Sequence, residues 1–160
     1  MYYEREMIAI ATYIKLVLNI EFEIYLTEEN RCARTDGHNI YVSKKWLRVI
    51  KQNLEIIPMI CHEAFHIWQR HAVLYELVSL DKIILWQTEL TNYNPPEEGT
   101  DIYLLQDIER TATIFSDIVL YKLTGIHLDV IGEFSDEEIN FVKSLDFDFH
   151  EEIYRISASC

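Results

Sequence analysis

The sequence predicts an α+β fold in which a small sheet packs on a central helix and the C-terminal part is mostly helical. Residues 20–26 (IEFEIYL) alternate between apolar and polar side chains, which is the period of a half-buried strand. An Asp-Gly pair at 36–37 lies between two extended segments and is typical of a hairpin turn. Elsewhere apolar residues recur at helical spacing, and glycine (4) and proline (3) are scarce, which favours long regular elements.

The N-terminal third is expected to hold one helix and three strands. Residues 4–19 have the apolar spacing of an amphipathic helix, which should precede the strand at 20–26. Residues 31–35 and 38–43 should pair through the Asp-Gly turn, and both central positions of that turn are expected to take positive φ. Residues 44–52 should form a short helix. The strands would then make a small twisted sheet, antiparallel or mixed.

A central buried helix is predicted from residue 58 to about residue 80, because its residues are apolar over most of its circumference. Pro58 suits the first turn of this helix, and residues 81–90 should continue in helical form. One apolar stripe contains Ile57, Cys61, Phe65, Trp68, Ala72 and Tyr75, and a neighbouring stripe contains Ile60, Ala64, Ile67 and Leu74.

The remaining residues predict a loop and two further helices. Residues 91–100 (TNYNPPEEGT) combine Asn, a Pro pair and Gly, so they should form a loop, which we interpret as a lid. Residues 101–124 should form one helix that ends at Gly125. Ser135 and Glu138 have the spacing of a capping box, which opens a short helix.

The chain is expected to form a single domain of 160 residues with a cleft between two parts. The sheet-containing part would take up residues 1–90, and the helical part would take up residues 100–160. The net charge of -13 argues against a nucleic-acid partner and against anionic membrane surfaces, since both bind through Lys and Arg.

The sequence favours a cytoplasmic protein. Glu4 and Glu6 stand where a secretory leader would be basic, and no run of 18 apolar residues occurs. The three cysteines, Cys32, Cys61 and Cys160, are odd in number and lack CxxC spacing, so we expect no disulfide framework and a reducing compartment.

The stretch PMICHEAFHIWQ, residues 58–69, carries the HExxH pattern on the central helix. His62 and His66 are four residues apart, so both imidazoles can face one point from the same side of a helix. Zinc accepts imidazole nitrogens, and Glu63 lies beside them, where it can take a proton from a water molecule. The alternative is a core helix whose two histidines form only local hydrogen bonds.

A zinc site needs a third protein ligand, and the central helix does not supply one. In the longer metzincin pattern Gln69 stands where glycine is required and Ala72 stands where histidine is required, while His71 is one residue early. Glu109, on the helix predicted at 101–124, lies at the edge of an apolar stripe and could face inward. Its alternatives are an ion pair with Arg110 or Lys122, or full solvation.

HEAFH, followed about forty residues later by the helical E-x-x-A of residues 109–112, resembles the gluzincin branch of the zincin metallopeptidases. The order of strand, hairpin and motif helix is similar to small cytosolic gluzincins, including the ImmA/IrrE-like peptidases, over residues 20–124. The resemblance implies a zincin-like fold with Zn²⁺ held by His62, His66 and Glu109. It also implies peptide hydrolysis with Glu63 as general base and acid.

Departures from the gluzincin pattern leave several roles open. The aspartate expected four residues after the glutamate ligand is Thr113 here, so Asp117 or Thr113 is expected to orient a ligand histidine. The residue that stabilises the oxyanion would come from His127, Tyr93, Tyr103 or Arg110. An edge strand at 31–35 or 38–43 would hold an extended protein or peptide substrate. The alternative function is a non-catalytic interaction module with structural zinc or none.

Overall fold

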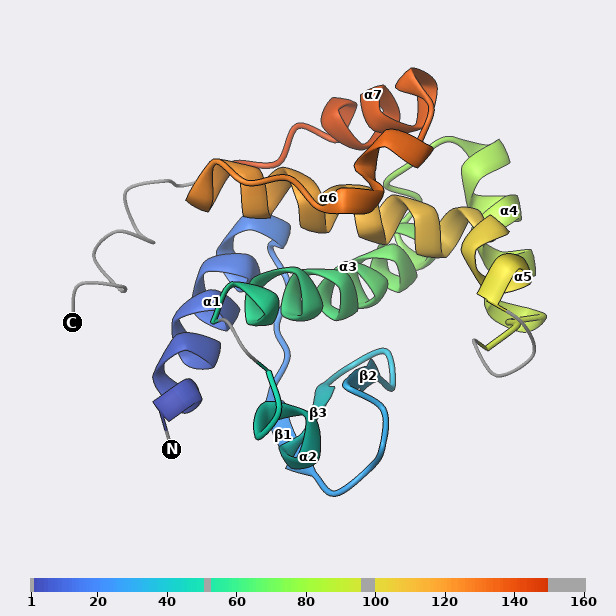
Figure 1. Cartoon of the computed structure of the whole chain (residues 1–160). Coiled ribbons are helices and arrows are strands. Elements are labelled where there is room, and N and C mark those ends of the chain that lie inside the picture. The colour runs from blue at the N-terminus through green and yellow to red at the C-terminus, as the bar shows by residue number, and fades with distance from the viewer. Residues whose placement is uncertain (1, 51–52, 96–99, 150–160) are drawn as a thin grey trace.

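The computed structural model describes residues 2–50, 53–95 and 100–149, which form a mixed α+β structure (Figure 1). The strands within these residues are β1 (Ile24–Thr27), β2 (Ala33–Thr35) and β3 (Ile40–Ser43). The helices are α1 (Tyr2–Leu18), α2 (Lys44–Leu47), α3 (Ile56–Leu74), α4 (Leu80–Thr91), α5 (Thr100–Leu105), α6 (Asp107–Thr124) and α7 (Asp136–Ser144), with short 3-10 segments at Asn53–Glu55 and Asp129–Glu133.

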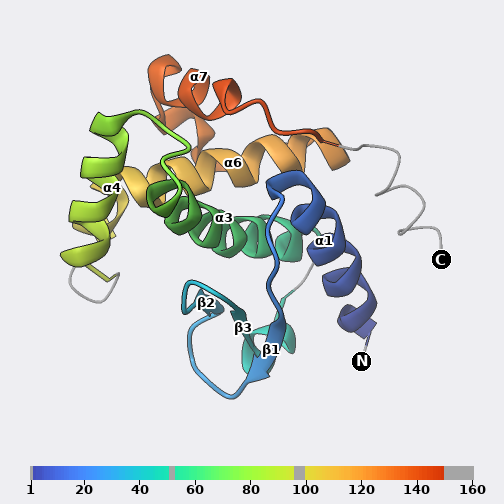
Figure 2. The ribbon, with the colours of Figure 1, turned by 180° about the vertical axis from the view of Figure 1, so that it is seen from behind.

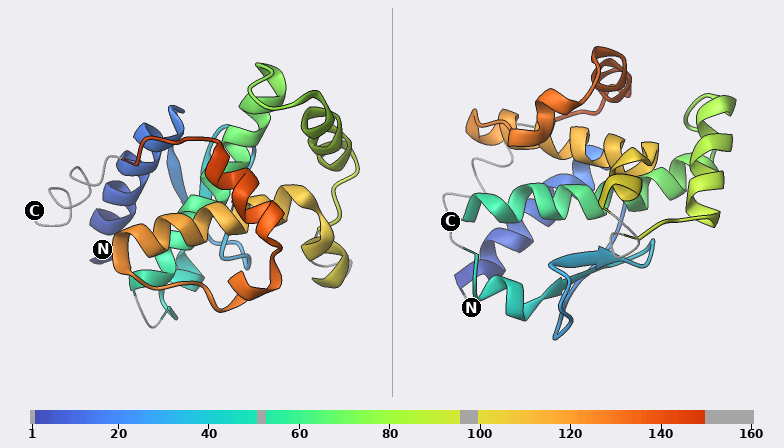
Figure 3. Two further views of the ribbon diagram at one scale, coloured as in Figure 1. Left: turned by 90° about the horizontal axis from the view of Figure 1, so that it is seen from above. Right: turned by 45° about the vertical axis from the view of Figure 1, so that its right-hand side comes forward.

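Helix α3 is the centre of the structure, and other elements pack on it from several sides. The sheet lies on one side of α3 and α6 on the other, and α7 packs on the outer side of α6 (Figures 1 and 3). Helix α1 also packs against α3, as the reverse view shows (Figure 2). Helices α4 and α5 both pack on α6. Residues far apart in sequence therefore meet along α3.

The buried face of α3 confirms most of the two predicted apolar stripes. The stripe residues from Ile57 to Ala72 are buried, and α3 packs against α1, α6 and the sheet. The Phe65 ring stacks on Phe115 of α6 at 4.7 Å between centroids. The stripes were predicted to reach Leu74 and Tyr75, but those side chains are 70% and 64% exposed.

The predicted length of α3 was therefore wrong. The helix ends at Leu74, and the positive φ of Glu76 (55°) turns the chain away. A separate helix, α4, begins after Ser79, whose side chain accepts a hydrogen bond from the Lys82 amide. The Ser79 cap stops the two helices from merging, because an N-cap residue has extended backbone.

The sheet has the strand order β1-β3-β2, with β1 parallel and β2 antiparallel to β3. The predicted hairpin of β2 and β3 is confirmed. Of the two strands proposed as a substrate-binding edge, the one at 38–43 is excluded because β3 is central. Strand β2 is an edge and packs against α3.

Residues 20–26 alternate in burial as predicted, although only their end is a strand. Ile20 and Phe22 are buried, whereas Glu21 and Glu23 are exposed. Pairing with β3 begins where the Ile40 amide donates to the Glu23 carbonyl at 2.9 Å. The apolar face therefore follows the period of an extended chain even before the strand starts.

The turn between β2 and β3 differs from the predicted one. Among its residues only Gly37 has positive φ (92°), and the turn spans residues 36–39. The Asp36 carboxylate accepts hydrogen bonds from the amides of His38 (2.9 Å) and Asn39 (2.8 Å). These side-chain bonds replace the backbone geometry of a two-residue turn.

The segment predicted as one helix over 101–124 is two helices. Helix α5 ends at Leu105, and α6 starts after Gln106, whose ψ of 127° is extended. The Gln106 side chain accepts from the Asn94 amide and donates to the Asn94 carbonyl, so the break is held by the preceding loop. Of the predicted loop at 91–100, residues 96–99 lie outside the described residues.

The ends of the last two helices confirm their sequence signals. Helix α6 stops at Gly125, which has a left-handed φ of 74°, and Ser135 forms a reciprocal capping box with Glu138 at the start of α7. Cys32 and Cys61 carry free thiols, and Cys160 falls outside the described range. Among the helices described here, none has the length and apolar character needed to cross a membrane.

Candidate metal centre

Helix α3 presents His62 and His66 on the same face, toward the start of α6. Their side chains are 19% and 12% exposed, so both reach the edge of the core. Neighbouring residues on α3, including Ile60, Ala64 and Ile67, are fully buried and fix the helix in rotation. The HExxH spacing thus places both imidazoles together, as the sequence predicts.

Glu109 lies in the first turn of α6, and its carboxylate meets both histidines. His62 Nε2 is 3.0 Å from Glu109 Oε2, and His66 Nε2 is 3.4 Å from Glu109 Oε1. The two Nε2 atoms are 3.0 Å apart. Glu109 is only 1% exposed, which excludes the solvated alternative, and Arg110 beside it pairs with Glu138 instead.

These three groups could hold a metal ion. Their ligand atoms all lie within 4.8 Å of one another. In a tetrahedral zinc site with bonds of about 2.0–2.1 Å, neighbouring ligand atoms lie roughly 3.3 Å apart, and the two Nε2 atoms, 3.0 Å apart, are close to that separation. Two imidazoles and one carboxylate also match a catalytic ligand set, which leaves a fourth position open.

Gln69 fixes the orientation of His66, a role that the sequence did not predict. Gln69 is fully buried, and its Nε2 donates to the Ile108 carbonyl and to the Thr111 hydroxyl oxygen, both at 2.9 Å. Its Oε1 therefore faces His66 Nδ1 at 2.7 Å and accepts a hydrogen bond from the Nδ1–H group. Neutral His66 then carries its lone pair on Nε2, which points at Glu109 and His62.

The predicted orienting residues were wrong. Asp117 lies two turns beyond Glu109, where it accepts hydrogen bonds from His127 Nδ1 and from the Leu128 amide. The Thr113 hydroxyl donates to the carbonyl of Glu109 and not to a histidine. The signal that could have pointed to Gln69 is an amide side chain within the apolar face of α3, three residues after His66.

Replacing Gln69 with leucine is expected to lower zinc affinity by about tenfold to a hundredfold, because His66 would lose the acceptor that sets its tautomer. Stability should also fall by about 1–3 kcal/mol, since a buried N–H and a buried carbonyl lose partners. Competition with a chromophoric chelator and urea unfolding measure the two effects. Gln87→Leu, on the exposed face of α4, is the matched control, and unchanged zinc affinity in Gln69→Leu would contradict the role.

The electrostatics of the cluster favour an ionised Glu109. Burial penalises its charged form, but the hydrogen bonds from His62 and His66 outweigh burial, and the pKa of Glu109 lies well below its usual value. Burial acts to lower the pKa of His66, yet contact with Glu109 raises it overall. A metal ion here would replace the positive charge that the imidazoles otherwise supply.

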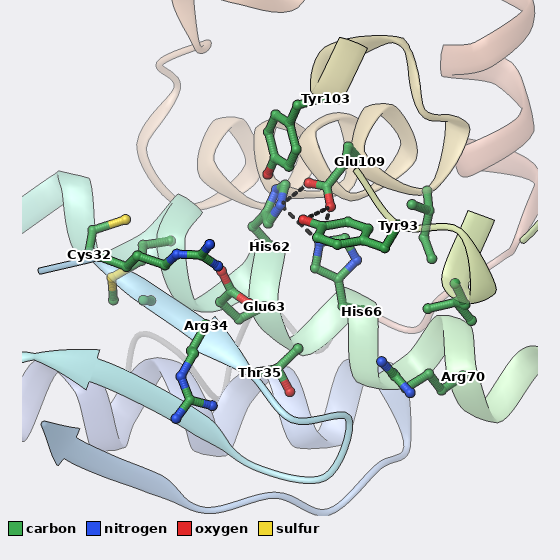
Figure 4. A pocket seen from close by; sticks show the side chains of 15 residues that line it. Cys32, Arg34, Thr35, His62, Glu63, His66, Arg70, Tyr93, Tyr103 and Glu109 are labelled. Atoms are coloured by element: carbon green, nitrogen blue, oxygen red, sulfur yellow. Dashed lines mark hydrogen bonds and ion pairs between the residues drawn. The ribbon is translucent and has the colours of Figure 1, made fainter. Parts of the chain in front are cut away.

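A cavity of about 580 Å³ opens over the cluster (Figure 4). Residues 31–35, which include β2, line one side, and His62, Glu63 and His66 of α3 line the floor. Figure 4 shows Glu63 projecting into the space between α3 and β2. The predicted general base thus shares the cavity with the predicted ligands.

Two of the four residues predicted to stabilise an oxyanion reach the cavity. The Tyr93 hydroxyl donates to Glu109 Oε1 at 2.8 Å, and the Tyr103 ring lies edge-on to Tyr93 at 6.4 Å between centroids. Burial and the charge of Glu109 raise the pKa of both tyrosines, so both hydroxyls remain proton donors. His127 and Arg110 are held at other places, by Asp117 and Glu138.

The start of α6, which carries Glu109, is fixed by a residue of α4. The Glu89 carboxylate accepts hydrogen bonds from the amides of Asp107 (2.9 Å) and Ile108 (2.8 Å). These amides belong to the first turn of α6 and have no partner within the helix. Glu89 therefore helps to fix the position of the first turn of α6, from which Glu109 reaches the histidines.

No protein-family model, no curated protein and no solved structure matches this chain. The interpretation of the site therefore depends on its own geometry. That geometry consists of two imidazoles and a buried carboxylate that converge, an amide that orients one imidazole, and a second carboxylate in the same cavity.

Proposed function

We propose that the protein is a zinc-dependent peptidase of the gluzincin kind. His62, His66 and Glu109 would hold the metal, and Glu63 would act as general base and acid. The observation that supports this most strongly is the convergence of the two Nε2 atoms and the Glu109 carboxylate at the floor of a cavity that also contains Glu63. The mixed sheet packed on the HExxH helix agrees with a zincin-like fold.

The reaction follows from the positions of the side chains. Bound zinc would supply a Lewis acid that polarises the peptide carbonyl and lowers the pKa of water. Glu63 takes a proton from the attacking water and returns it to the leaving amine nitrogen. Gln69 would hold the Nδ1–H group of His66, so that Nε2 is the nitrogen that binds the metal. The Tyr93 and Tyr103 hydroxyls line the same cavity and would donate hydrogen bonds to the negative charge that forms on the carbonyl oxygen.

The edge strand β2 offers a way to hold the substrate. It pairs with β3 on one side only, and residues 31–35 form a wall of the cavity. An extended peptide could add to this edge by backbone hydrogen bonds, which would lay its scissile bond across the floor of the cavity. A protein or peptide substrate is therefore proposed.

The proposal is tested by metal content and by metal removal. Protein refolded or purified with zinc is expected to hold about one zinc per chain and to cleave a pool of unrelated peptides. A chelator should abolish cleavage, and added zinc should restore it. Wild-type protein that takes up no zinc under these conditions would overturn the proposal.

A non-catalytic interaction module is the second candidate, and the contacts of Glu109 favour it. Both oxygens of Glu109 already have partners, since His62 contacts Oε2 while Tyr93 and His66 contact Oε1. Such a cluster can join α3 to α6 without any metal. Stoichiometric zinc without cleavage of any peptide, or absence of zinc in a stable protein, is the result that this candidate predicts.

A further inference from the structure

We infer that Arg70 selects substrates that carry a carboxylate near the cleaved bond, so that the natural substrate is an acidic peptide segment. This inference rests on the proposed function. Arg70 follows His66 by one helical turn on α3 and lines the same cavity as the histidine–glutamate cluster (Figure 4). Its side chain is exposed, so the guanidinium is accessible from solvent.

Arg70 has no ion pair within the described residues, in contrast to Arg34 and Arg110. Arg34, also on the cavity wall, makes two hydrogen bonds to the Glu29 carboxylate at 2.9 Å. Arg110 pairs with Glu138. No carboxylate of the described residues pairs with Arg70. A guanidinium that faces a cavity without a partner is a ready site for an incoming carboxylate, which it can bind through two parallel hydrogen bonds.

The hairpin turn leaves room for Arg70 to lie against it. A Cβ added at Gly37 would come within 2.6 Å of Arg70 Cδ and 2.8 Å of its Nε. Only glycine therefore permits this approach, and the stem of Arg70 rests on the turn between β2 and β3. The contact limits the directions in which the long side chain can point, which lowers the entropy lost when it binds a ligand.

The cavity is less acidic than the chain as a whole. The chain carries a net charge of -13, whereas three arginines and two glutamates line the cavity, and Arg34 among them is paired with Glu29. One of those glutamates, Glu109, is a proposed metal ligand, so a bound divalent cation makes the cavity clearly positive. A positive cleft in an acidic protein attracts anionic segments to the site and disfavours binding elsewhere on the surface.

The position of Arg70 sets the distance of the recognised carboxylate from the reacting bond. Four residues along a helix separate Arg70 from His66 by about 6 Å. An extended peptide advances about 3.3 Å per residue. The carboxylate should therefore lie about two residues from the bond that faces the cluster. It can come from an Asp or Glu side chain, or from a free C-terminus.

Binding to peptide pools tests this inference separately from hydrolysis. Labelled short peptides, random except for one position fixed as Glu, Gln or Lys, are titrated with zinc-loaded Glu63→Gln protein, which should not cleave them. Pools with a free C-terminus and with an amidated C-terminus separate the two sources of carboxylate. We expect the best Glu pool, or the free-acid pool, to bind about tenfold to a hundredfold more tightly than its neutral counterpart.

Variants at position 70 show whether this preference comes from Arg70. Arg70→Gln in the same background should remove the preference, Arg70→Lys should keep part of it, and Arg70→Glu should reverse it in favour of Lys pools. Arg48→Gln, an equal change of charge just after the end of α2 and outside the cavity, should leave the preference intact. Zinc content should stay the same in all of them.

Several outcomes would overturn the inference. The first is that Glu and Gln pools bind equally and that free-acid and amidated pools also bind equally. The second is a preference that survives Arg70→Gln. The third is that no pool binds. An Arg70-dependent preference in a zinc-loaded protein that never cleaves a peptide would support carboxylate recognition and contradict the peptidase. Cleavage of peptides without any charge preference would support the peptidase and contradict carboxylate recognition by Arg70.

Discussion

Replacing Glu63 with glutamine is expected to reduce peptide hydrolysis by roughly a hundredfold to ten-thousandfold while zinc remains bound. Glutamine has the size of glutamate but cannot take a proton from water or return one to the leaving amine. Glu63 is not one of the converging groups, because those are His62, His66 and Glu109. The change should therefore lower the rate of the chemical step and leave the metal centre intact.

The measurement combines metal analysis with turnover of a cleaved peptide. Glu55→Gln, at the exposed N-terminal cap of the same helix, makes the same chemical change outside the cavity and should keep wild-type turnover. Equal rates for Glu63→Gln and wild type would remove Glu63 from the proton transfers. Loss of zinc in Glu63→Gln would show that the residue supports the metal instead.

Replacing Glu109 with alanine should weaken zinc binding by more than about a hundredfold. Residues that only orient a ligand typically contribute tenfold to a hundredfold, and a direct ligand should contribute more. Both histidines of the cluster belong to α3, and Glu109 is the member of the cluster that α6 supplies. Its loss leaves no second element to close the site.

Thermal unfolding with and without zinc separates this effect from ordinary destabilisation. Glu109 is buried with both histidines around it, so its removal also changes the stability of the metal-free protein. A ligand present at about one hundred times its Kd adds about 2.7 kcal/mol to stability. Wild type should show this gain and Glu109→Ala should not, while Glu137→Ala, exposed on α7, should behave as wild type. An equal gain in all three proteins would exclude Glu109 as a ligand.

Local signals were enough to predict the parts that depend on neighbours in the sequence. The spacing of His62 and His66 on an apolar helix places two imidazoles on one face, and no distant residue is needed for that step. The hairpin, the capping box at Ser135 and the stop at Gly125 are likewise local. Glu109 could be predicted as a ligand because its helix carries a clear apolar stripe. Its contact with α3, however, depends on tertiary packing.

The parts that were not predicted depend on contacts between distant segments. Gln69 was considered only as a residue that breaks the metzincin pattern, whereas its role comes from Ile108 and Thr111, about forty residues away. The break before α6 is fixed by Asn94 and Glu89 from an earlier segment. The central place of β3 follows from its parallel pairing with β1, which no local pattern encodes.

The break at Gln106 separates the proposed metal ligands from the two tyrosines that line the same cavity. Every proposed ligand, together with Gln69, belongs to α3 or to the part of α6 beyond the break. Both tyrosines of the cavity, Tyr93 and Tyr103, precede it. Substitutions in the segment that precedes the break should therefore reshape the wall of the cavity while the ligands themselves stay the same. Tyr93 and Asn94 are the exceptions, because they hydrogen-bond to Glu109 and to Gln106 and so connect the wall to the metal centre.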